Sequence, residues 1–180
     1  MPQNTRLTQQ HSLHTISFSR CSKLPYPPPP PSTTSVSTAT TTTPPHLILN
    51  AHVIVELLGP SLLKNANTHV NTVDALANKK VILLYFSAHW CGPCRHFTPL
   101  LTEFYDTHKE IREDDFEVVF VSSDRDMGGF STYFGCMPWL ALPFGSYLKG
   151  AISSKFSVRG IPTLIALDAH TGEVVSNDGR

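Results

Sequence analysis

The sequence predicts an α/β fold because a strand, a helix and a second strand follow one another along the chain. Residues 81–87 are almost entirely apolar, as in an inner strand of a parallel sheet. From about residue 91 to 109 apolar side chains recur at helical spacing, and residues 116–121 are again mostly apolar. Together they predict a right-handed βαβ unit whose helix starts at the carboxyl end of the first strand.

Shorter elements are expected on both sides of this unit. They are an edge strand around residues 69–71, a turn of helix near 73–76, helices around 129–136 and 147–156, and strands within 158–167 and 173–175. The segment 137–144 is apolar and aromatic and contains two prolines. It is expected either to pack as a lid on the core or to border the functional site and contact partners.

The motif Trp90-Cys91-Gly92-Pro93-Cys94 lies where the first strand meets the helix. A C-x-x-C pair at such a junction is typical of a redox dithiol. The positive end of a helix stabilises a thiolate, and in such motifs the pKa of the first cysteine falls from about 8.5 to about 7 or below. We therefore expect Cys91 to be the attacking thiolate and Cys94, one turn further on, to resolve the mixed disulfide. Pro93 fits the start of a helix because the N–H it lacks would be unpaired there.

Half of a zinc site is the alternative interpretation of this cysteine pair. Zinc commonly requires a second close pair of ligands. The other cysteines, Cys21 and Cys136, stand alone, and no H-x3-5-H pair lies near the motif. We therefore predict no metal site.

The first 45 residues differ in composition from the rest of the chain. Residues 27–31 are consecutive prolines, and residues 32–43 are almost entirely serine and threonine. Such a segment buries too little apolar surface to offset the entropy of ordering. We predict a disordered tail at residues 1–45 and a folded domain at 54–180. The tail also resembles an organelle transit peptide in lacking acidic residues. We expect a cytoplasmic protein, with a mitochondrion or plastid as the alternative location.

Charge and hydropathy exclude two classes of partner. Residues 56–180 contain 11 basic and 14 acidic residues, whereas nucleic-acid-binding domains are typically basic. No apolar run reaches the roughly 18 residues that a membrane-spanning helix needs. We therefore expect no nucleic acid partner and no membrane span. Four cysteines, two of them in one C-x-x-C pair, favour a reducing compartment.

Motifs that lie far apart in the chain resemble one family. The segment 85–95, the following Phe97-Thr98-Pro99, the segment 137–144 and Ile161-Pro162-Thr163-Leu164 are together similar to the thioredoxin superfamily, and within it to the tryparedoxin and nucleoredoxin branch. The resemblance covers about residues 54–180. It implies a thioredoxin-like three-layer α/β/α fold with a central mixed β-sheet. The helix that normally closes this fold is expected to be missing, because residues 177–180 are too few to form it.

The resemblance also implies roles for individual residues. The Ile161–Pro162 bond is expected to be cis, in a loop that lies against the dithiol and pairs through its backbone with an extended substrate segment. Trp90, Gly92 and Pro93 are expected to contact substrate as well. Tyr85 stands where thioredoxins carry a buried carboxylate. We expect Tyr85 to be a core residue, which leaves the proton acceptor for Cys94 unassigned.

The predicted function is that of a thiol–disulfide oxidoreductase, a protein-disulfide reductase that uses the Cys91–Cys94 dithiol. Its substrates would be protein disulfides. No bound cofactor is expected, because the chain lacks a G-x-G-x-x-G motif. An external reductase or low-molecular-weight dithiol, supplied by NADPH, would regenerate the dithiol. The alternative is a redox-sensitive binding or regulatory protein of the nucleoredoxin type with little turnover.

Overall fold

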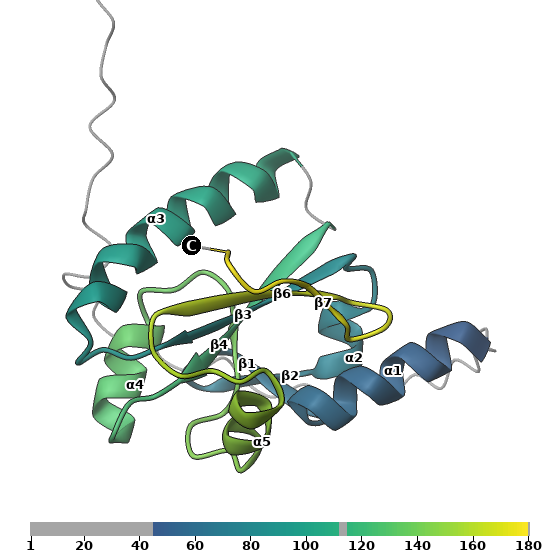
Figure 1. The fold of residues 1–180 in the computed structure, drawn as a ribbon, viewed down its shortest axis with the longest axis horizontal. Helices are drawn as coiled ribbons and strands as arrows, with labels where there is room; N and C mark the ends of the chain where they lie inside the picture. Colours follow the sequence, from purple (N-terminus) through teal and green to yellow (C-terminus); the bar gives the residue numbers. More distant parts are fainter. Residues whose placement is uncertain (1–44, 112–114, 180) are drawn as a thin grey trace, which may run out of the picture. The chain divides into compact units, whose positions relative to one another are not determined.

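A seven-stranded mixed β-sheet forms the centre of the fold (Figure 1). The computed structural model describes residues 45–111 and 115–179. The strand order is β2-β1-β5-β4-β3-β6-β7. The strands are β1 (Ser61–Asn65), β2 (Thr68–Asn71), β3 (Val81–Ser87), β4 (Phe116–Ser122), β5 (Leu140–Ala141), β6 (Thr163–Asp168) and β7 (Val174–Ser176).

Helices cover both faces of the sheet, which gives the expected three layers (Figure 1). One apolar cluster joins the sheet to α3 and α4, and a second joins the opposite face to α1, α2 and α5. The helices are α1 (Pro45–Leu58), α2 (Thr72–Leu76), α3 (Gly92–Ile111), α4 (Met127–Phe134) and α5 (Leu148–Lys155).

The predicted βαβ unit is β3, α3 and β4. Strands β3 and β4 pair in parallel from Val81 opposite Phe116 to Ser87 opposite Ser122. The side chains of these strands alternate between the two apolar clusters, so both strands are buried on both faces. Helix α3 buries one stripe of residues, at helical spacing, against the sheet: Cys94, Thr98, Leu101 and Tyr105. The unit thus brings the dithiol motif to the carboxyl end of β3.

The segment 137–144 is not a loop throughout, because Leu140–Ala141 form strand β5. This strand pairs with β4 and β1. Trp139 is almost completely buried, and its ring packs against those of Tyr85 and Tyr105. The segment therefore belongs to the core, as in the first of the two interpretations of its sequence.

Two elements in the first part of the domain were not predicted. Helix α1 begins at Pro45, ahead of residue 54, where composition had suggested that the domain starts. Strand β1 pairs with β2 in a hairpin, whereas the sequence had indicated only the second strand. The expected tail at residues 1–44 lies outside the described residues.

Beyond β7 the chain continues without a helix as far as Gly179, the last described residue. The N–H of Gly179 donates to the carbonyl oxygen of Leu164, at 3.3 Å. Within residues 45–111 and 115–179, no helix combines the length and the apolar character needed to cross a membrane.

Helix α5 ends in a Schellman motif that has serine where glycine is usual. Ser157 has a φ of 52°, in the left-handed region. Its N–H donates to Ser154 O at 3.2 Å, and the N–H of Val158 donates to Ser153 O at 2.9 Å. A residue with a Cβ is strained in this conformation by about 1–2 kcal/mol.

Replacing Ser157 with Gly should therefore raise the free energy of unfolding by about 0.5–1 kcal/mol, because the relief of strain exceeds the added entropy of the unfolded chain. Urea denaturation of the two proteins measures the difference. Ser154→Gly is the matched control: Ser154 has helical geometry, and this change should lower stability by about 0.5–1 kcal/mol. A Ser157→Gly variant no more stable than the parent would contradict the argument.

Candidate active site

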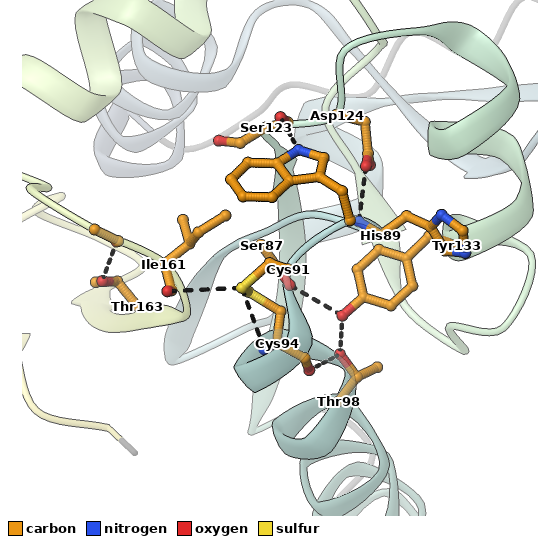
Figure 2. Close-up of a disulfide and its surroundings, with 12 residues drawn as sticks. Ser87, His89, Cys91, Cys94, Thr98, Ser123, Asp124, Tyr133, Ile161 and Thr163 are labelled. Atoms are coloured by element: carbon orange, nitrogen blue, oxygen red, sulfur yellow. Dashed lines mark hydrogen bonds between the residues drawn. A yellow bond between two sulfur atoms is a disulfide. The ribbon is translucent and has the colours of Figure 1, made fainter.

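The two cysteines of the motif are joined as a disulfide at the start of α3 (Figure 2). Cys91 is the residue before the helix, and Cys94 lies in its first turn, with 5.2 Å between their Cα atoms. Cys94 is completely buried, whereas 6% of Cys91 is exposed. An external disulfide can therefore reach Cys91 first.

The surroundings of Cys91 favour a thiolate. The backbone N–H of Cys94 points at Cys91 Sγ from 3.3 Å. The first turn of α3 contains no acidic residue, so no negative side chain offsets the positive end of the helix. A thiolate at Cys91 would thus receive a hydrogen bond and favourable charge from the same helix end.

The loop before β6 lies against the dithiol. The Ile161–Pro162 bond is cis, as the resemblance implied. Ile161 O lies 3.8 Å from Cys91 Sγ (Figure 2). The Ile161 side chain packs against the small buried cluster of Ala88, Cys91 and Cys94. Pro162 is buried. Two segments about 70 residues apart in sequence therefore form one site.

Trp90 is a half-exposed platform beside the cysteines and not a core residue. About 51% of its surface is exposed. Its indole N–H donates to Ser123 O at 3.0 Å, and the Arg125 guanidinium stacks 5.1 Å from the ring centre. Gly92 and Pro93, also expected to contact substrate, are respectively half-exposed and exposed. The motif thus presents Trp90, Gly92 and Pro93 to solvent around Cys91.

Asp124 fixes the backbone that carries Trp90. One carboxylate oxygen of Asp124 accepts the N–H of His89 at 2.7 Å (Figure 2). The other accepts the hydroxyl of Ser122 at 2.8 Å. The segments after β3 and β4 are therefore held together by one side chain.

Four hydroxyl groups form a closed hydrogen-bonded ring next to Cys94. Tyr85 Oη lies 2.8 Å from Thr98 Oγ1 and 3.0 Å from Ser87 Oγ. Tyr133 Oη closes the ring, because it lies 3.0 Å from Ser87 Oγ and also bonds to Thr98 Oγ1 (Figure 2). Thr98 Oγ1 donates in addition to Cys94 O at 2.9 Å. The ring thus joins β3, α3 and α4 where the dithiol is held.

This hydroxyl ring has fewer protons than contacts. Each hydroxyl donates one proton. If Thr98 donates its proton to Cys94 O, the two tyrosine hydroxyls must each donate to Thr98 Oγ1. Ser87 then has one proton to donate, although two tyrosine oxygens lie within its reach. The four side chains are buried, and each contributes a hydroxyl group and no carboxylate or ammonium group. The polar interior beside Cys94 is therefore neutral and almost fully hydrogen-bonded.

Comparison with known proteins agrees with this arrangement. The profile of a family described as Thioredoxin-like matches residues 78–174, more than half of the chain. The chain belongs to the Thioredoxin-like family. The dithiol and the cis-proline loop lie within that matched region, whereas strands β1 and β2 lie ahead of it.

The relatives of this thioredoxin-like chain include nucleoredoxins and tryparedoxins. Probable nucleoredoxin 1 of Arabidopsis thaliana is 54% identical over 101 residues, which are 56% of this chain and 17% of that protein. Tryparedoxin of Trypanosoma brucei brucei is 46% identical over 102 residues, 56% of this chain and 69% of that protein. Native tryparedoxin I from Crithidia fasciculata superposes with a TM-score of 0.63 at 42% identity, covering 72% of this chain and 86% of that one. The chain therefore spans less than a fifth of the nucleoredoxin.

This thioredoxin-like protein carries a Cys91–Cys94 pair at disulfide distance. Tyr85 is a core residue, as expected, but sequence reasoning missed its hydroxyl partners. Thr98 and Tyr133 lie 13 and 48 residues beyond Tyr85, on two different helices. The sequence contained one hint of these contacts: Tyr85, Thr98 and Tyr133 each place a hydroxyl group among the apolar residues of their own strand or helix. Among residues 45–111 and 115–179, no group of three or more side chains could hold a metal ion.

Removing the Thr98 hydroxyl should destabilise the fold by about 1.5–3 kcal/mol, since Thr98→Val keeps the shape but takes one hydrogen-bond partner from each of the two buried tyrosine hydroxyls. Urea denaturation measures the loss. Thr102→Val is the matched control on the same helix, because its hydroxyl donates only to Thr98 O; it should cost less than about 1 kcal/mol. Equal losses in the two variants would contradict a special role for the ring.

Alkaline pH should unfold this protein through two buried tyrosines. Burial raises the pKa of Tyr85, and burial together with the Glu117 carboxylate raises the pKa of Tyr105. Above pH about 10 these groups lose protons in the unfolded chain but keep them in the folded one, so stability should fall as pH rises. Urea denaturation between pH 9 and about 11 measures the slope. Tyr105→Phe should flatten it. Tyr147→Phe, at an exposed side chain, should not.

Proposed function

We propose that this protein is a protein-disulfide reductase in which Cys91 is the nucleophile and Cys94 the resolving cysteine. One observation carries the proposal. Cys91, of which 6% is exposed, receives the Cys94 N–H on its sulfur at the start of α3 and faces Ile161 O, whereas Cys94 is completely buried. This asymmetry supports different roles for two chemically identical groups.

The reaction consists of two exchanges. The Cys91 thiolate attacks one sulfur of a substrate disulfide, forming a mixed disulfide and releasing the other sulfur as a thiolate that takes up a proton. Cys94 then loses its proton and attacks Cys91 Sγ, which breaks the mixed disulfide and releases the second substrate thiol. The substrate has gained two electrons and two protons, and the protein retains the Cys91–Cys94 disulfide.

Substrate binding is assigned to the surface around Cys91. An extended segment would pair with the backbone at Ile161 and Pro162 by strand addition. Trp90 would form a flat wall for this segment, supported by its exposure and by its bond to Ser123 O. Gly92 and Pro93 would provide contact beside the reactive sulfur. A Cβ at Gly92 would meet no atom within 4 Å, which leaves open space at that position.

Regeneration needs electrons from outside the chain. We propose an external reductase or a low-molecular-weight dithiol, supplied ultimately by NADPH, with no cofactor bound to this protein. A dithiol that must be reduced after every turnover suits a reducing compartment. We therefore propose a cytoplasmic protein, with a mitochondrion or plastid as the alternative. The redox-sensitive binding protein considered from the sequence stays a prediction, since no contact in the site favours it.

Replacing Cys91 with Ser should abolish insulin reduction driven by dithiothreitol, because no thiolate remains to attack. Cys94→Ser should instead accumulate mixed disulfides with substrate, visible as higher-mass species that dithiothreitol removes. Absence of trapped species in the Cys94 variant would contradict the assigned roles. No turnover from the folded parent protein would contradict the reductase and leave the binding protein.

A further inference from the structure

All three arginines of the described residues lie in segments that border the dithiol. Arg95 directly follows Cys94, and its N–H donates to Cys91 O at 3.1 Å. The guanidinium of Arg125, on the segment after β4, stacks 5.1 Å from the Trp90 ring. Arg95 and Arg125 therefore stand on two separate elements that border Cys91.

The third arginine comes from the cis-proline loop. Arg159 lies two residues before Ile161, whose carbonyl oxygen is 3.8 Å from Cys91 Sγ. Arg95, Arg125 and Arg159 are all exposed, and none of them forms an ion pair with a described residue. We call these three residues the arginine rim. Each member is available to a ligand.

Acidic residues near the rim are few and already engaged. Asp124 uses one carboxylate oxygen on the His89 N–H and the other on the Ser122 hydroxyl. Asp126 caps α4 by accepting the N–H of Gly129 at 2.8 Å. Residues 86–102 and 156–167 contain no acid, although residues 56–180 as a whole carry 14 acidic and 11 basic residues. Three arginines against these two carboxylates leave a positive excess at the dithiol of a domain that is acidic as a whole.

We infer that the arginine rim selects protein disulfides whose cysteines are flanked by acidic residues. The inference rests on the proposed reductase activity and names its substrate class. Exposed arginines bind carboxylates in a bidentate geometry and speed the encounter with a negatively charged partner. A net acidic domain would repel such a partner everywhere except at the rim.

An extended polypeptide fits the rim better than a small anion does. The three charges arise from three separate segments, so a ligand that contacts more than one of them must extend beyond its disulfide. A strand laid along Ile161 passes Arg159 and carries side chains in both directions from its cysteine. Acidic residues at these flanking positions are therefore the feature that the rim recognises.

The test compares three peptide disulfides of equal length, whose cysteines are flanked by Asp, Gln or Lys. Reduction by the full chain is measured at pH 8. Rates are normalised to the reduction of the uncharged bis(2-hydroxyethyl) disulfide. The Asp peptide should be reduced about tenfold faster than the Lys peptide at low salt, and the difference should largely disappear at about 1 M NaCl.

Variants then locate the charges responsible. Arg95→Gln and Arg159→Gln should each lower the ratio of Asp-peptide to Gln-peptide rates by about two- to threefold, and together they should nearly remove the preference. Lys64→Gln is the matched control, because it removes one exposed positive charge from β1, outside the segments around the dithiol. This control should leave the ratio unchanged.

Two results would overturn the inference while preserving the reductase: equal normalised rates for the three peptides, or a Lys64→Gln effect as large as those of the arginine variants. A preference for glutathione disulfide without any preference among peptides would also overturn it, because the ligand would then be a small anion. Failure to reduce any disulfide, including the uncharged one, would overturn the proposed reductase and the inference together.

Discussion

The hydroxyl ring beside Cys94 determines where the dithiol can lie. Polar groups removed from water must find partners, and here the four hydroxyls satisfy one another and the carbonyl oxygen of Cys94. The members belong to β3, α3 and α4, so the first turns of α3 cannot move from the sheet without breaking several bonds at once. The cysteines therefore remain at the carboxyl end of β3, opposite the cis-proline loop.

The central elements of this fold were predictable because they repeat a local pattern. The double-sided apolar character of β3 and β4 and the single apolar stripe of α3 are visible in any short window of the sequence. The dithiol was equally predictable, since a C-x-x-C spacing such as that of Cys91 and Cys94 is typical of a redox-active pair. Its position against Ile161 came only from family resemblance, because no local pattern relates residues 70 positions apart.

The features missed by sequence analysis depend on contacts between distant segments. Strand β5 has two residues and no periodicity of its own; it is a strand because β4 and β1 offer backbone partners on both sides. Helix α1 directly follows a segment rich in proline, serine and threonine. Its buried residues Ile54, Leu57 and Leu58 stabilise it by packing against the sheet, which no local pattern predicts. The hydroxyl of Tyr85 likewise joins the hydrogen-bonded ring only because the fold brings Thr98 and Tyr133 close to it.

The free-energy penalty of removing a charge from water explains where charged groups lie in this site. A buried carboxylate beside Cys94 would pay a large desolvation penalty, and the ring provides hydroxyl groups there that hydrogen-bond without any charge. The full charges of the site lie nearer the surface, on the half-buried Asp124 carboxylate and on the exposed arginine rim. The exposed arginines attract an acidic partner, and they carry little desolvation penalty because they stay in contact with water. The interior of the site therefore positions the sulfurs, while its surface is left to distinguish among substrates.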